Sequence, residues 1–245
     1  MKEDELRNEY NRILNDELYA RKLLGFSTDE ALMEHEKFCF EHEFKEFSAK
    51  ALAAVHKYET WNHTEKSGVP LRFADSSFYN YEPRNEEEQN AKDKIISFVE
   101  RENNDGVLIL AGSKGTGKTH LGTSAVRATL GHYSNMEDII IRLESSMNFK
   151  AEMREEEVYK DYATTSFLVI DEIGRTLKQE KENEILSYIL RKRYDNMLPT
   201  ILISNLDKAT LLKKLGEAVV DRLCETGEYI EFKGTSFRIG KRKIA

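Results

Sequence analysis

From residue 89 onward, short apolar runs alternate with longer segments in which apolar residues recur every three or four positions. The short runs predict buried strands, and the longer segments predict helices with one apolar face. We expect helices at 89–99, 120–130, 144–162 and 184–193, and strands at 107–110, 138–142, 166–170 and 200–203. Strands that alternate with helices form a parallel sheet, with the binding site at the carboxyl ends of the strands. The pattern predicts an α/β fold with a central parallel sheet flanked by helices.

The first 60 residues carry a different pattern, in which helical spacing predominates. We expect a small all-α domain at 1–60, a linker at 61–72 that contains Gly68 and Pro70, and the main domain at 73–245. One predicted helix of the small domain carries an apolar stripe: Phe40, Phe44, Phe47, Ala51, Val55 and Tyr58. Since two helices bury little surface by themselves, the stripe is expected to form the domain's own core, with part of it left for a partner helix.

Composition narrows the class of protein. Of the 245 residues, 40% are hydrophobic and 33% are charged, which permits a buried core in a soluble chain. No apolar run approaches the ~20 residues of a membrane span, and the acidic N-terminus is unlike a signal or transit peptide. Cys39 and Cys224 lie far apart, which supports neither a disulfide framework nor a zinc site. We therefore expect a cytoplasmic protein with no membrane partner.

The charge of the chain bears on its partners. A formal net charge of −7 argues against a protein that coats nucleic acid through bulk charge. It leaves room for a local basic groove, because the residues after Glu231 contain bases and no acid: Lys233, Arg238, Lys241, Arg242 and Lys243.

A glycine-rich turn with the spacing G-x-x-x-x-G-K-T separates the strand at 107–110 from the following helix. Glycines let successive backbone N–H groups point into one concavity, and the helix N-terminus adds partial positive charge, which suits a triphosphate. Lys118 is expected to reach the β and γ phosphates of ATP, and the Thr119 hydroxyl is expected to hold Mg²⁺. The predicted nucleotide contacts are Gly112, Ser113, Lys114, Gly115, Thr116, Gly117, Lys118, Thr119 and His120.

Two carboxylates end the strand that begins at residue 166. Ending a buried strand in Asp171 and Glu172 is costly unless both acids have a function. Asp171 is predicted to hold the Mg²⁺ shell together with Thr119, and Glu172 is predicted to be the base that deprotonates the attacking water. Asn205, just after the strand at 200–203, is placed to hydrogen-bond the water or the γ phosphate.

An aromatic cluster precedes the main domain, formed by Phe73, Phe78, Tyr79 and Tyr81. Its position ahead of the nucleotide loop suits a lid beside the adenine. Ordinary core packing explains the same residues at least as well.

These motifs together resemble those of the AAA+ ATPases. The segment 215–223 is similar to the stretch that carries the arginine finger in DnaC-type helicase loaders, and 235–238 (Thr-Ser-Phe-Arg) resembles their sensor 2 element. The segments 69–73 and 77–81 match the entry into the ATPase domain of DnaC, DnaI and the transposon helper IstB. The resemblance implies that Asn205 is sensor 1, that Arg238 is sensor 2, and that Arg222 reaches into a neighbouring subunit's site.

The resemblance also implies a function: an ATP-dependent loader acting in DNA replication. The N-terminal helices would bind a hexameric replicative helicase, and the ATPase domains would self-associate around single-stranded DNA. ATP hydrolysis, completed by an arginine from the next subunit, would drive release of the loader. The resemblance suggests that the helix from about residue 143 to 162 faces the DNA, with Lys150, Arg154 and Lys160 as candidate phosphate contacts. The acids of the same segment favour an ordinary solvated helical face instead.

Two alternatives stay open. The first is a transposition helper ATPase of the IstB type, which acts on duplex DNA beside a transposase. The second is a nucleotide-dependent binding module that scarcely hydrolyses ATP; Glu172 argues against it, since a pure switch needs no base.

Overall fold

The computed structural model describes residues 67–101, 106–148 and 153–237. The expected helical domain at 1–60 and Arg238 lie outside the described residues. A short 3₁₀ helix, η1 (Leu71–Phe73), lies near the start of the described part, within the region predicted to be a linker.

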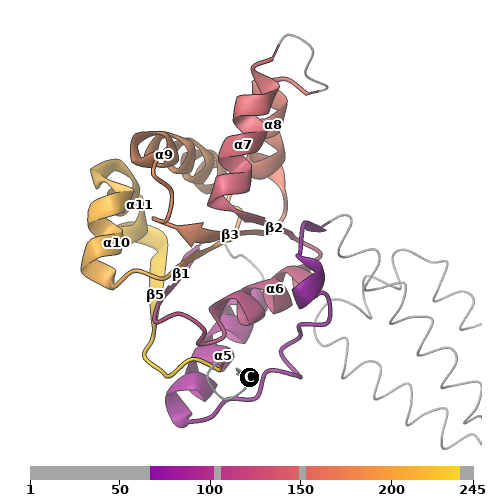
Figure 1. Ribbon diagram of the computed structural model, residues 1–245, viewed down its shortest axis with the longest axis vertical. Helices are drawn as coiled ribbons and strands as arrows, with labels where there is room; N and C mark the ends of the chain where they lie inside the picture. Colours follow the sequence, from indigo (N-terminus) through magenta and orange to yellow (C-terminus); the bar gives the residue numbers. More distant parts are fainter. Residues whose placement is uncertain (1–66, 102–105, 149–152, 238–245) are drawn as a thin grey trace, which may run out of the picture.

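A five-stranded sheet forms the centre of the molecule, with the strand order β2-β3-β4-β1-β5 (Figure 1). Every pair of neighbouring strands is parallel, which confirms the predicted fold class. The strands are β1 (Val107–Gly112), β2 (His132–Asn135), β3 (Leu168–Ile173), β4 (Thr200–Ser204) and β5 (Gly227–Phe232). β1, β3 and β4 lie where apolar runs predicted strands, while β5 was not predicted.

The described helices form a layer on each face of the sheet (Figure 1). One layer contains α5 (Glu86–Val99) and α6 (Lys118–Thr129). The other contains α7 (Met136–Ser146), α8 (Glu155–Thr164), α9 (Gln179–Asp195), α10 (Lys208–Leu215) and α11 (Glu217–Thr226). Alternate residues of β1 serve the two cores: Leu108 and Leu110 pack with the first layer, Ile109 and Ala111 with the second. No helix in the described part of the chain is long and apolar enough to cross a membrane.

The prediction of a strand at 138–142 is wrong, because these residues lie in α7. The Asn135 side chain caps this helix by accepting a hydrogen bond from the Asp138 N–H at 2.8 Å. Ile139, Ile140 and Leu143 are buried at helical spacing, whereas Ile141 is 52% exposed. The strand of this region is the preceding segment β2, whose sequence His-Tyr-Ser-Asn has no apolar run.

The prediction of one continuous helix at 144–162 is also wrong. α7 ends at Ser146 and a separate helix, α8, begins at Glu155. The Glu157 carboxylate caps the N-terminus of α8, because it accepts a hydrogen bond from the Arg154 N–H at 2.7 Å. The segment expected to face DNA is therefore two helices rather than one.

Arg193 of α9 is a buried cation that joins three elements, with 1% of its surface exposed. Its guanidinium donates to the carbonyls of Tyr162 (2.9 Å), Thr165 (2.7 Å) and Pro199 (2.6 Å), and to the Thr200 hydroxyl (2.8 Å). Burial lowers the pKa of Arg193 to about 9. One side chain thus satisfies the backbone where α8 ends and β4 begins.

Replacing Arg193 with methionine should lower stability, because the buried carbonyl of Tyr162 and the partly buried carbonyls of Thr165 and Pro199 lose their donor. Unsatisfied buried polar groups cost about 1–3 kcal/mol each. We take the lower figure for each carbonyl, about 3 kcal/mol in total, because two of the three are only partly buried. Since 1 kcal/mol shifts Tm by roughly 2–4 °C in a chain of this size, we expect a fall in Tm of about 6–12 °C. Arg191→Met, at an exposed position of the same helix, is the control in thermal unfolding followed by circular dichroism. Equal Tm values for the two variants would contradict this assignment.

Candidate nucleotide-binding site

The predicted phosphate loop connects β1, which ends at Gly112, to α6, which begins at Lys118. Two of its glycines are required by close contacts as well as by backbone angle. Gly115 has φ 77° and a Cβ there would lie 2.1 Å from the Ser236 Oγ; Gly117 has φ 93° and a Cβ there would lie 2.5 Å from the ring of Tyr81. The loop is therefore packed from two sides by segments distant in sequence.

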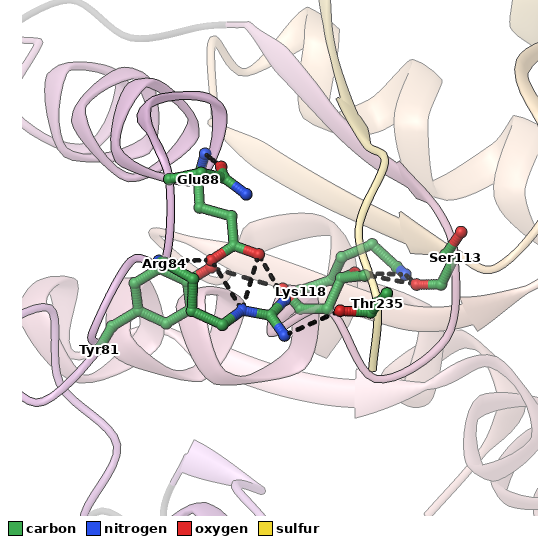
Figure 2. A network of polar contacts seen from close by, with 8 residues as sticks. Tyr81, Arg84, Glu88, Ser113, Lys118 and Thr235 are labelled. Atoms are coloured by element: carbon green, nitrogen blue, oxygen red, sulfur yellow. Dashed lines mark hydrogen bonds and ion pairs between the residues drawn. The ribbon is translucent and has the colours of Figure 1, made fainter. Parts of the chain in front are cut away.

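Lys118 lies inside the curve of this loop and is buried. Its Nζ donates to the Gly112 carbonyl at 2.9 Å. It also donates to the Ser113 carbonyl at 2.6 Å (Figure 2). The Thr116 hydroxyl donates to the Ser113 carbonyl at 2.9 Å and closes the turn. An ammonium group and the N-terminus of α6 thus lie together, which is the arrangement that binds phosphate groups.

Asp171 lies at the end of β3 and is 3% exposed. Its Oδ2 accepts hydrogen bonds from the Thr119 hydroxyl at 2.7 Å and the Tyr133 hydroxyl at 3.1 Å, and its Oδ1 accepts one from the Glu172 N–H at 2.5 Å. Burial raises the pKa of the Asp171 carboxyl. The structure therefore brings the two predicted metal residues into direct contact.

Mg²⁺ fits this pair of side chains. The ion takes oxygen ligands and keeps several waters, so one or two protein oxygens beside substrate phosphates suffice. Thr119 and Asp171 would hold it, and the ion would supply positive charge to the phosphate oxygens. Tyr133 was missed by sequence reasoning, because it lies on the polar strand β2, which no apolar run indicated.

Glu172 has an unusual backbone for a strand residue, with φ 59°. The pairing of β3 with β4 shifts register between Ile170 and Ile173, so Asp171 and Glu172 form a bulge. A non-glycine residue in the left-handed region costs on the order of 1–2 kcal/mol, and both such strain and bulges cluster at functional sites. The half-buried Glu172 carboxylate forms an ion pair with Arg175.

Three further catalytic residues were predicted, and they lie in different parts of the chain. Asn205 directly follows β4, which lies between β1 and β3, and is exposed. It therefore lies at the same sheet edge as the phosphate loop and Glu172. Arg222 lies on α11, and Arg238 lies outside the described residues.

Tyr81 is the member of the aromatic cluster that reaches the loop. It is 4% exposed, and its hydroxyl lies 3.4 Å from the Thr116 carbonyl oxygen, to which it donates. Burial raises its pKa to about 12. The His120 ring lies 5.5 Å from the Tyr81 ring, and its Nε2 lies 3.1 Å from the Ser77 carbonyl oxygen. The predicted nucleotide contact His120 thus packs its side chain against the segment that precedes α5.

The other aromatic residues of that cluster differ in how deeply they are buried. Tyr79 is 60% exposed, whereas Phe73 and Phe78 pack on the core formed with α5 and α6. Core packing accounts for Phe73 and Phe78.

The last described residues pass beside the phosphate loop. The Phe237 N–H donates to the Gly115 carbonyl at 2.8 Å, and its ring stacks on the Arg84 guanidinium at 3.5 Å. Arg84 also pairs with Glu88 at 2.5 Å and donates to the Thr235 hydroxyl at 3.4 Å (Figure 2). The residue directly before Arg238 is therefore anchored to the loop.

A parallel sheet in this order, with a phosphate loop after β1 and two acids at the end of β3, defines a P-loop ATPase fold of the AAA+ class. The chain belongs to the family of IstB-like ATP binding proteins, whose model matches residues 26–245.

Two relatives and one solved structure illustrate the likeness. The replicative helicase loader DnaC of Escherichia coli strain K12 is 29% identical over 176 residues, which cover 69% of this chain and 70% of that protein. A protein of insertion sequence IS232 from Bacillus thuringiensis subsp. berliner is 29% identical over 154 residues, or 59% of each chain. The crystal structure of the DnaC helicase loader matches with a TM-score of 0.59 and 28% identity, covering 67% of this chain and 100% of that one. The resemblance inferred from the motifs is confirmed.

Proposed function

We propose that this protein is an ATPase that loads a hexameric replicative helicase onto DNA. The observation that carries the proposal is the match to the DnaC helicase loader, which spans 100% of that solved chain. The contact between Thr119 and Asp171, with Lys118 inside the phosphate loop, supports nucleotide binding by the same fold.

In this proposal each element of the site has one task. Residues 112–120 bind ATP, with Lys118 on the β and γ phosphates. Thr119 and Asp171 hold Mg²⁺. Glu172 accepts a proton from the attacking water, and Asn205 orients that water or the γ phosphate.

The site is completed by a second subunit. Arg222 acts on the ATP of the neighbouring subunit, and Arg238 acts on the ATP of its own. A guanidinium offers paired hydrogen bonds to the charge on the transferring phosphoryl group. Because a monomer lacks the neighbour's arginine, self-association and hydrolysis become coupled. The helical domain at 1–60 binds the helicase, the linker at 61–72 connects it, and the ATPase domain at 73–245 assembles around single-stranded DNA.

The test is complex formation by the full chain with the hexameric helicase of its own organism. With ATP and Mg²⁺, we expect a stable complex in light scattering and binding of a fluorescent single-stranded oligonucleotide. With ADP, DNA affinity should fall at least about tenfold, since hydrolysis is proposed to drive release. No complex, together with equal and negligible DNA affinity in both nucleotide states, would overturn the proposal.

A second candidate is a transposition helper that acts on duplex DNA. The family match to IstB-like proteins and the relative from insertion sequence IS232 favour it. Tagged protein purified from its host separates the two functions: a loader brings a hexameric helicase, and a transposition helper brings a transposase.

A further inference from the structure

The turn that follows Glu172 is fixed at four points by hydrogen bonds. The Glu172 carbonyl accepts from the Arg175 N–H at 3.3 Å, and the Ile173 carbonyl accepts from the Ser204 hydroxyl at 2.8 Å. Gly174, at φ 81°, is held by side chains on both of its backbone groups. Such a turn controls where the preceding carboxylate points.

Glu182 of α9 holds the N–H of Gly174. Its Oε1 accepts that hydrogen bond at 2.6 Å, and the residue is 1% exposed. Its Oε2 has no hydrogen-bond partner among the described residues, and burial raises the pKa of the carboxyl. Burying an acid is costly, and the hydrogen bond from the Gly174 N–H offsets part of that cost.

Lys214 of α10 holds the other side of Gly174. Its Nζ donates to the Gly174 carbonyl at 2.7 Å, and its own carbonyl accepts a hydrogen bond from the Gln179 side chain at 3.1 Å. Lys214 lies one residue before the end of α10, and Gly216 leads directly into α11, the helix that carries Arg222.

We propose that Glu182 and Lys214 are positioning residues, which clamp Gly174 from both sides and thereby aim the Glu172 carboxylate at the attacking water. This inference rests on the proposed hydrolytic function and adds two residues to its machinery. The clamp also ties the position of Glu172 to α10, the helix that precedes the arginine-bearing helix. Within the described part of the chain, neither side chain forms a hydrogen bond with the phosphate loop, so we expect nucleotide binding not to depend on them.

The expected result is a loss of turnover without a loss of binding. Lys214→Met and Glu182→Met should lower kcat about 10- to 100-fold, because small displacements of a catalytic group cost rate factors of this size. KM and the affinity for a fluorescent ATP analogue should stay within about twofold. Glu182→Gln keeps an acceptor oxygen for the Gly174 N–H and should restore most of the rate lost in Glu182→Met.

The measurements use the full chain assembled with its helicase, with saturating ATP and Mg²⁺ and single-stranded oligothymidine in every assay. Lys213→Met and Glu180→Gln, at exposed neighbouring positions, are the matched controls. Each clamp substitution is also combined with Glu172→Gln, where it should cause no further loss of hydrolysis, since its effect acts through Glu172. If Glu182→Met does not fold, Lys214→Met and Glu182→Gln complete the test.

The outcomes separate this inference from the proposed function. Wild-type kcat in Lys214→Met, or an equal loss of kcat, ATP affinity and Tm, would overturn the clamp. If Glu172→Gln is inactive while the clamp variants behave as the controls, only the clamp fails. If Glu172→Gln hydrolyses ATP as fast as the wild type, or if the wild type does not hydrolyse it at all, the proposed chemistry fails and the clamp fails with it.

Discussion

Glu172→Gln should reduce ATP hydrolysis by about 10²- to 10⁴-fold, the range that general bases contribute. The amide has nearly the same shape as the carboxylate but cannot accept the proton of the attacking water. Binding of ATP should change little, because Glu172 lies at the end of β3 and not in the phosphate loop. Phosphate release and the fluorescence of a labelled ATP analogue measure the two quantities separately.

Glu184→Gln, at an exposed position of α9, is the control for this substitution. The hydrolysis assay should include the helicase and single-stranded DNA, so that a fully assembled site is tested. If the wild type and Glu172→Gln then hydrolyse ATP equally slowly, the protein is a nucleotide-dependent binding module and Glu172 is not a base.

Arg222→Ala should reduce hydrolysis in the assembled complex by about 10³- to 10⁵-fold, the range of an arginine supplied from outside a site. ATP binding to the isolated subunit should persist, since Lys118 and Thr119 remain. Arg191→Ala, at an exposed position of α9, should behave as the wild type. Unchanged turnover in the loaded Arg222→Ala complex would show that hydrolysis needs no arginine from a neighbour.

A mixing experiment tests whether Arg222 acts across subunits. Lys118→Ala subunits keep Arg222 but lose their own site, and Arg222→Ala subunits keep the site but lose the finger. In a head-to-tail assembly, an equimolar mixture restores roughly a quarter of the interfaces, although each variant alone is inactive. A mixture that stays inactive would place Arg222 in its own subunit's site or outside catalysis.

The parts of this site that lie within one strand and its adjacent turn were predictable. β1 and the loop from Gly112 to Thr119 follow from an apolar run, glycine spacing and a helix with one apolar face. The same local logic placed Asp171 and Glu172 at the end of β3, where Asp171 is buried and contacts Thr119.

Local patterns failed where the decisive contacts come from distant segments. Ile139 to Ile141 favour a strand by composition, but the cap at Asn135 and the burial of Ile139 and Ile140 in the core beside β3 make this segment helical. β2 is a strand because it pairs with β3 and buries Tyr133, a reason absent from its own sequence. The contacts of Tyr81 with Gly117, and of Tyr133 with Asp171, likewise need the folded chain. The clamp on Gly174 joins the turn after β3 to α9 and α10, so spacing along the chain gave no indication of it.

The place of β1 in the sheet has a consequence for biosynthesis. β1 pairs with β4 on one side and β5 on the other, and the Ser113 N–H in the loop donates to the Phe232 carbonyl at 3.0 Å. When the ribosome has synthesised the phosphate loop, it has not yet synthesised β5, the strand to which the loop is hydrogen-bonded. We therefore expect a premature stop before β5 to leave the phosphate loop without this support and to weaken ATP binding by the truncated chain.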